Sequence, residues 1–196
     1  MLFAGLGTWT VAFIALFGER IRSRWNRPDL VVELVNAGGE LETQTFRRQD
    51  DAGVTQQRTR DARHYRLRVT NRNRRGPAHE VHVVVESVTR ASEVGAEPVL
   101  EVRGPIPLTW EHADAFPAMR NVGAPVVADL FAVTSDRTLS LLTNPPRKDY
   151  VLRADLLITV VARSLEQESR PLRIMVVWDG DWQIGEREMR QHLRVE

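Results

Sequence analysis

Hydrophobic residues recur at every second position in six separate segments of this chain, a period that indicates extended strands. In one of these segments, Tyr65, Leu67 and Val69 alternate with polar residues. A shift of one residue would turn such an apolar set to water, so the register is well specified. The pattern predicts a mostly β protein with an antiparallel β-sandwich. The six segments are 30–35, 64–70, 81–86, 126–132, 150–163 and 172–178.

Turn-forming residues separate these segments. Residues 36–39 (Asn-Ala-Gly-Gly) end the first segment, and residues 71–77 join the second to the third. Residues 144–146 (Asn-Pro-Pro) precede the longest segment. Asp179-Gly180 separates the last segment from Asp181-Trp182, which predicts a tight hairpin with Trp178 and Trp182 packed across it. Trp178 continues the apolar set of the last segment and is predicted to be buried. The alternative is that one or both tryptophans form an exposed aromatic platform for a sugar or a proline-rich peptide.

Two stretches lack the strand period. Residues 48–63 contain only one aliphatic residue larger than alanine, Val54, and are predicted to form a long loop. Glu186 and Arg190 have the spacing of an i,i+4 ion pair, which favours a short helical turn over 186–191.

The amino-terminal 18 residues carry no charged side chain. As a helix this run would be about 27 Å long, close to the ~30 Å hydrocarbon core of a bilayer. Arginines and a tryptophan follow it, as is typical after a membrane-spanning helix. We predict a transmembrane anchor over 1–18, a basic juxtamembrane segment over 19–27 and a β-sandwich domain over 28–196. The predicted membrane-interface residues are Arg20, Arg22, Arg24, Trp25 and Arg27.

Two other interpretations of residues 1–18 fit the sequence less well than an anchor. A cleaved signal peptide needs a basic region before the apolar run and a small-x-small site after it, and neither is present. A buried core helix fits the length, but the basic residues that follow favour a membrane boundary. Positive charges beside a spanning helix stay in the cytoplasm, so we predict that the β-domain is cytoplasmic.

The charge and cysteine content exclude several classes of function. The net charge is +1, from 27 basic and 26 acidic residues, and it gives no global field to attract nucleic acid. The chain has no cysteine, so it can form neither disulfides nor thiolate metal sites.

Two groups of side chains invite a metal-site interpretation. His79 and His82 are three apart on a predicted strand and would point to opposite faces, so surface histidines are the favoured interpretation. Asp179 and Asp181 lie near a turn, but Glu186 and Glu188 do not complete the spacing of a calcium loop. We therefore predict no metal site and no cofactor.

Two further groups were weighed as catalytic or binding sites. The sequence Trp110-Glu111-His112 with Asp114 offers an acid and an imidazole, but no nucleophile motif accompanies them. A set of arginines is predicted to lie on solvated loops, with contact to anionic lipid headgroups as the second choice. These arginines are Arg58, Arg60, Arg63, Arg72, Arg74 and Arg75.

Several segments resemble a broad group of uncharacterised bacterial proteins that have one N-terminal membrane helix and an immunoglobulin-like sandwich. The segments are LFGERIRSRWNRP, HYRLRVTNRNRRGPAHEVHVVVESV, PIPLTWEH, RNVGAPVVADL, DYVLRADLLITV, WDGDW and EMRQHLRV. The resemblance covers nearly the whole chain in scattered patches. It implies an immunoglobulin-like fold and a single-pass protein of the bacterial inner membrane, and it brings no catalytic residues with it.

We therefore expect a membrane-tethered domain that is not an enzyme and that binds another protein. The expected contact is an exposed sheet edge or the loops at the membrane-distal end. The alternative is a membrane effector that senses a small-molecule ligand through the β-domain. The other expected partners are the lipid bilayer, through the N-terminal helix, and a second copy of the chain.

Overall fold

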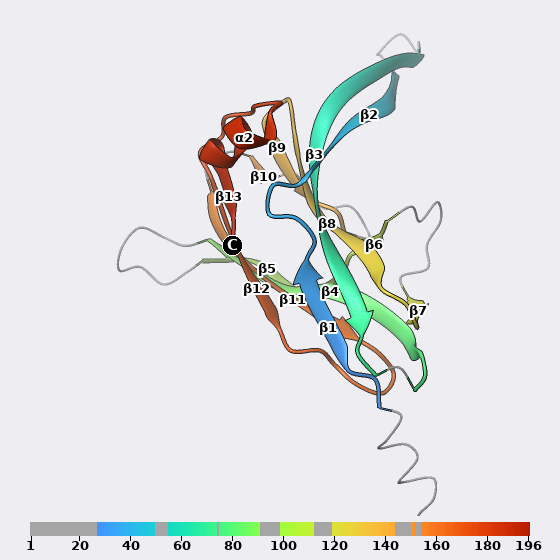
Figure 1. The fold of residues 1–196 in the computed structure, drawn as a ribbon. Helices are drawn as coiled ribbons and strands as arrows, with labels where there is room; N and C mark the ends of the chain where they lie inside the picture. The colour runs from blue at the N-terminus through green and yellow to red at the C-terminus, as the bar shows by residue number, and fades with distance from the viewer. Residues whose placement is uncertain are drawn as a thin grey trace, which may run out of the picture.

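The computed structural model describes residues 27–49, 55–73, 75–90, 99–111, 119–143, 150–151 and 154–196. Most of these residues form strands, and the strands build two antiparallel sheets that enclose one hydrophobic core (Figure 1). The predicted mostly β fold is confirmed, and its layers are those of a β-sandwich.

The first sheet is centred on the long strand β3 (Thr55–Asn71). Its path runs β1-β3-β8-β9-β10, while β2 also pairs with β3 and β6 pairs with β8. The other strands are β1 (Leu30–Leu34), β2 (Glu40–Gln49), β6 (Thr109–Trp110), β8 (Val126–Thr134), β9 (Thr138–Leu141) and β10 (Tyr150–Val151).

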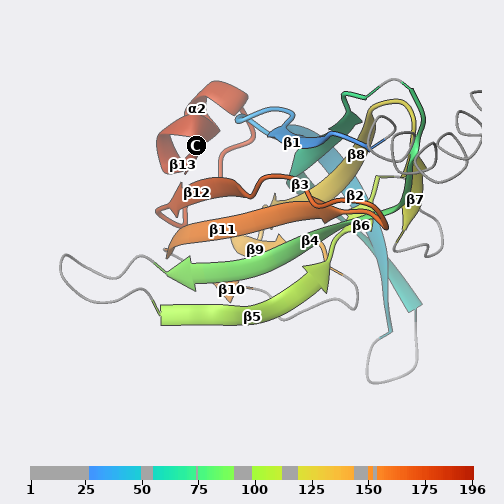
Figure 2. The same cartoon turned by 90° about the horizontal axis from the view of Figure 1, so that it is seen from below.

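The second sheet runs β13-β12-β11-β4-β5, and β7 also pairs with β4. Figure 2 shows β12, β11, β4 and β5 side by side in one layer. The strands of this sheet are β4 (Ala78–Arg90), β5 (Val99–Pro107), β7 (Arg120–Val122), β11 (Ala154–Arg163), β12 (Leu172–Trp178) and β13 (Leu193–Val195). The helix α2 (Glu186–His192) directly precedes β13.

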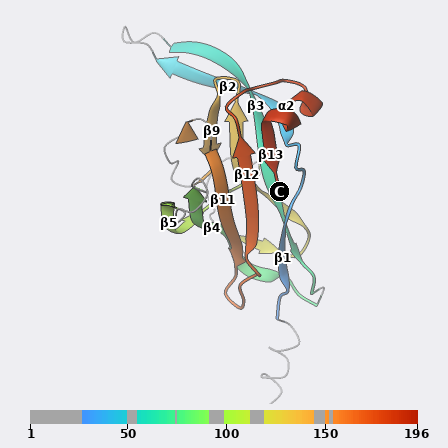
Figure 3. The same cartoon turned by 90° about the vertical axis from the view of Figure 1, so that its left-hand side faces the viewer.

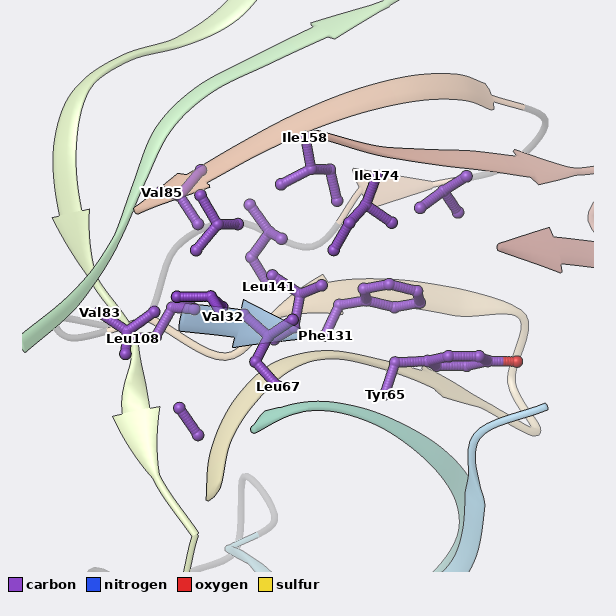
Figure 4. Close-up of a cluster of buried hydrophobic side chains, with 14 of the residues drawn as sticks. Val32, Tyr65, Leu67, Val83, Val85, Leu108, Phe131, Leu141, Ile158 and Ile174 are labelled. Carbon is purple, nitrogen blue, oxygen red and sulfur yellow. The ribbon is translucent and has the colours of Figure 1, made fainter. Parts of the chain in front are cut away.

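The predicted apolar faces meet in the core between the sheets. The rings of Tyr65 and Phe131 are stacked, with centroids 4.5 Å apart. Ile158 and Ile174 approach from the second sheet (Figure 4). Trp178 is also in the core and only 2% exposed, so the prediction that it is buried is confirmed.

The predicted loop over 48–63 is wrong. Most of this stretch belongs to strands, because β2 pairs with β3 from Glu40 opposite His64 to Gln49 opposite Thr55. A polar ribbon needs no apolar period when its backbone groups pair with each other. Figures 1 and 3 show this ribbon projecting beyond the body, at the end opposite the start of β1.

The predicted single strand over 150–163 is also wrong, because its two ends belong to different sheets. Tyr150 and Val151 form β10, which pairs with β9 in the first sheet. Residues from Ala154 onward form β11 in the second sheet. The alternation of apolar residues in the sequence does not show at which residue the chain passes from one sheet to the other. The predicted turn over 144–146 lies outside the described residues.

The hairpin predicted at Asp179-Gly180 is wrong as well. After Trp178 the chain passes through a loop and α2, and only then does β13 return antiparallel to β12. Gly180 has a positive φ of 95°, which suits the turn but does not make it a hairpin. Trp182 therefore does not face Trp178 across two strands, although it does pack against the core. The predicted helical turn is confirmed as α2.

Candidate functional site

One edge of the first sheet is open along β1. Among the described residues, β1 pairs only with β3. The flanking backbone bonds from Val35 N–H to the Arg66 carbonyl and from Arg72 N–H to the Asp29 carbonyl fix which residues face β3. Since such bonds alternate along an antiparallel pair, the N–H and C=O groups of the even-numbered residues point away from β3. These residues are Leu30, Val32 and Leu34.

A groove of about 440 Å³ runs beside this open edge. Its opposite wall is the 167–172 segment, which leads into β12. The second sheet is also partly uncovered here, because on the β13 side of β12 the backbone pairing reaches only as far as Met175, which bonds to Glu196. The groove therefore lies where two sheet edges approach each other. Its lining combines apolar and charged side chains: Asp29, Leu30, Val31, Val32, Arg72, Gln167, Glu168, Ser169, Arg170, Pro171 and Leu172.

Two asparagines fasten the start of the domain beside the groove. The buried Asn71 side chain accepts from Asp29 N–H at 3.0 Å and donates to the Gly76 carbonyl at 2.9 Å. Asn73 donates through Nδ2 to the Arg27 carbonyl at 2.6 Å. The 71–77 turn thus holds the segment that enters β1. The sequence predicted a turn here, but these long-range bonds had no local signal.

Most of the predicted membrane-interface residues lie outside the described part of the chain. These are Arg20, Arg22, Arg24 and Trp25, together with the predicted anchor over 1–18. Arg27 is described and is exposed. Within the described ranges, no helix combines the length and apolar character needed to cross a membrane.

A buried ion cluster centred on Arg66 covers part of the face of β3 that points away from the hydrophobic core. The Arg66 side chain is only 7% exposed, and its guanidinium donates through Nε to Asp129 at 2.9 Å. It also pairs with Glu111 at 3.2 Å and with both Glu40 and Glu42. Burial alone would lower the pKa of Arg66, but its hydrogen bonds to Asp129 and Glu42 raise it above the ordinary value. Sequence alternation placed Arg66 on the polar face but could not show that this face is covered.

His64 lies next to this cluster with a side chain only 8% exposed. Its Nε2 is 2.9 Å from the Gln44 amide nitrogen and 3.7 Å from a Glu42 oxygen. Burial lowers the pKa of His64, while the nearby carboxylates of Glu42 and Asp129 act in the opposite direction. Because burial is the largest effect, the structure favours a neutral imidazole at neutral pH.

The predicted set of basic loops is only partly correct. Arg58, Arg60 and Arg63 all lie in β3. Arg60 pairs with Asp136 at 3.1 Å, and the buried Arg63 donates to the Gly38 and Ile184 carbonyls at 3.2 and 2.7 Å. Arg72 and Arg75 are in the 71–77 turn as expected, and Arg74 lies outside the described residues.

The metal candidates give a mixed result. His79 is exposed and His82 half-buried on β4, as predicted for surface-strand histidines. In the described ranges, one trio has ligand atoms within 4.8 Å of one another, formed by Asp179, Asp181 and His192. Its members are already engaged, since His192 Nδ1 lies 2.8 Å from Asp179 and Asp181 pairs with Arg137 at 3.4 Å. The trio is therefore explained as a turn held by a hydrogen bond between His192 and Asp179 and an ion pair between Asp181 and Arg137.

The acid and imidazole after Trp110 do not form a described site. Trp110 is buried in the core, and Glu111 pairs with Arg66. His112 and Asp114 lie outside the described residues. The open edge of β1, with its groove, is therefore the main candidate site.

No family model matches the chain, and no curated protein or solved structure matches it either.

Proposed function

We propose that this chain is a membrane-tethered interaction domain, not an enzyme, that binds another protein along the open edge of β1. The observation that carries the proposal is the row of outward N–H and C=O groups at Leu30, Val32 and Leu34, beside a groove with room for an added chain. An extended segment satisfies such an edge by adding a strand to the sheet. We further propose that the sandwich is of the immunoglobulin-like type.

The polar clusters of the described residues support binding over catalysis. The carboxylates around Arg66 are engaged by its guanidinium, and Asp179 is engaged by His192. Such groups hold the fold together, since each carboxylate is tied to a partner on another segment of the chain. The lining of the groove can instead hold a backbone and its alternating side chains.

The tether is proposed from the apolar run over 1–18, and a cytoplasmic position of the domain in a bacterium is proposed from the basic residues Arg20, Arg22, Arg24 and Arg27. The bond from Asn73 to Arg27 supports a fixed exit point for the tether. A fluorescent protein fused to the C-terminus should fluoresce, and alkaline phosphatase fused there should stay inactive. The reverse pattern would place the domain outside the cytoplasm.

Photocrosslinking tests the binding surface directly. A photoreactive amino acid at the half-buried Val31 on β1 should give a discrete adduct in cells that express the chain natively. The same group at the exposed Ser135, in the turn between β8 and β9, is the matched control and should not give that adduct. Mass spectrometry identifies the captured protein. Equal adducts at both positions, or none at Val31, would refute binding at this edge.

The volume of the groove also favours the alternative, a membrane effector that senses a small molecule. About 440 Å³ falls within the ~300–1,000 Å³ typical of ligand pockets. Native mass spectrometry of the purified full chain distinguishes the two functions. A sensor should retain a small molecule of constant mass, which is lost when Leu172 is replaced by Trp to fill the groove.

A further inference from the structure

We infer that the partner at the β1 edge is a second copy of this chain, with the two β1 strands paired antiparallel about Val32. This inference rests on the proposed function, because it names the occupant of the same edge. It follows from the hydrogen-bonding pattern and the charges of β1.

Pairing centred on Val32 satisfies the outward backbone groups of both copies. It places Leu30 opposite the partner's Leu34 and Val32 opposite the partner's Val32. These are the residues whose N–H and C=O groups point away from β3, so each outward group meets another. A shift of one residue would instead bring them opposite residues already bonded to β3.

Charge selects this centre from the neighbouring ones that keep the same backbone pattern. Centring the pair on Glu33 would place two glutamates directly opposite each other. Centring it on Val31 would place Asp29 opposite the partner's Glu33. Like charges in directly opposed positions destabilise a strand pair. Centring on Val32 places Val31 opposite the partner's Glu33 and leaves no such clash.

The surroundings of β1 fit a second strand. The groove leaves space beside the open edge of β1. The side chains of Leu30 and Val32 are buried in the core, so a second strand would contact the backbone of β1 and extend the sheet. Antiparallel pairing sends the two amino-terminal segments off opposite ends, with the two Leu30 positions about 13 Å apart along the strands. Residues 19–29, fully extended, reach about 36 Å, so both proposed anchors can enter one bilayer.

The absence of cysteine in the chain allows a direct test of the register. Val31→Cys and Glu33→Cys are made separately in the full chain and reconstituted in vesicles, alone and as an equal mixture. Val31 and the partner's Glu33 form a non-hydrogen-bonded pair with Cα atoms about 4.5 Å apart, within disulfide reach. Identical positions lie on diagonals, about 7–8 Å apart.

Under mild oxidation, the mixture should give several-fold more cross-linked dimer than either variant alone. Ser135→Cys, an exposed control in the β8–β9 turn, measures random collision. Equal cross-linking in all samples, or cross-linking no greater than the control, would overturn the inference.

Two substitutions of opposite charge at Val31 provide a second measurement. Val31→Glu places a carboxylate opposite the partner's Glu33, whereas Val31→Lys places an ammonium there, and symmetry makes each change act twice. Sedimentation equilibrium of the full chain in detergent should show weaker self-association for the Glu variant than for the Lys variant. Equal association of the two variants would contradict this interface. If Val31 captures a different protein while the cysteine mixture stays uncross-linked, the second-copy inference fails and the proposed function stands.

Discussion

Between Ala62 and Leu67, the two faces of β3 are both buried, but by different physical means. On one face, Tyr65 and Leu67 lie in the hydrophobic core and are 1% and 0% exposed. On the other face, His64 and Arg66 are 7% and 6% exposed, although alternation assigns them to water. The first face is stabilised by apolar packing against the second sheet, and the second face by carboxylates from other segments of the chain.

The contrast shows what a period of two can establish. It identifies the face that carries apolar side chains and is therefore buried on folding. It does not establish that the other face is solvated, because that depends on which segments fold over it. Here Glu40 and Glu42 lie in β2, Asp129 lies in β8, and Glu111 directly follows β6.

The largest expected effect is on the apolar face. Leu67→Ala removes a fully buried side chain and leaves a cavity, and it should lower the free energy of unfolding by about 3 kcal/mol, within the ~2–5 kcal/mol usual for this change. Urea unfolding measures it. The loss should be the same at neutral and mildly acidic pH, since no charged group is involved. A loss below about 1 kcal/mol would mean that this face is not well packed.

Much of the strand framework was predictable from this apolar face. The segments around Leu67, Val83 and Ile174 were predicted as strands because each has a clear apolar set. The β2–β3 ribbon was missed because both of its faces are polar in sequence. The crossing from β10 to β11 was missed because the alternation in sequence does not show at which residue the chain passes from one sheet to the other. The first outcome depends on backbone pairing between two polar strands and the second on which sheet each strand joins, and the period of the side chains encodes neither.

The second prediction concerns the polar face. Arg66→Met keeps the length of the side chain but leaves four carboxylates without their cation. Breaking a fully buried pair usually costs ~3–5 kcal/mol. Glu40 and Glu42 are 47% and 42% exposed and can turn to water, so we expect a smaller loss of about 2 kcal/mol.

This loss should depend on salt concentration, unlike the loss for Leu67→Ala, in which no charged group takes part. Salt screens the attraction that Arg66 supplies and the repulsion among the carboxylates that remain without it, so the difference between Arg66→Met and the wild type should shrink at about 1 M NaCl relative to about 0.01 M. Urea unfolding at both salt concentrations measures it. A difference that does not change with salt would show that Arg66 acts through packing of its side chain alone.

The candidate site was predictable only in outline. An exposed sheet edge was expected, but the sequence did not show that β1 provides it, because β1 has the same alternation as the central strands. Its edge position follows from the pairing of β3, which pairs with β1 through residues 67–71 and with β2 through residues 55–64. The anchoring bonds of Asn71 and Asn73 were hidden for the same reason, since Asn71 reaches Asp29, 42 positions away.

The third prediction separates the buried carboxylates from the exposed ones. Asp129→Asn weakens the 2.9 Å bond to Arg66 at a position only 18% exposed, and it should cost about 1 kcal/mol. Glu40→Gln alters a carboxylate that is 47% exposed and should cost less than about 0.5 kcal/mol. Thermal or urea unfolding of the two variants tests the order. If Glu40→Gln were the more damaging change, the exposed rim of the cluster would carry the stability.

The smallest expected effect is the titration of His64. Burial lowers the pKa of this imidazole below its ordinary value of 6.5, so the folded chain binds a proton at this position less readily than the unfolded chain. The stability linked to His64 is therefore fully present above about pH 6.5 and is lost as the pH falls toward the lowered folded pKa. His64→Gln cannot titrate, so its unfolding free energy should fall less between about pH 7.5 and about pH 5.5 than that of the wild type. All other ionisable groups are the same in both proteins, so comparing the two pH differences isolates His64. Identical pH dependence in the two proteins would mean that the attraction of the neighbouring carboxylates for the charged imidazole offsets the effect of burial on the pKa of His64.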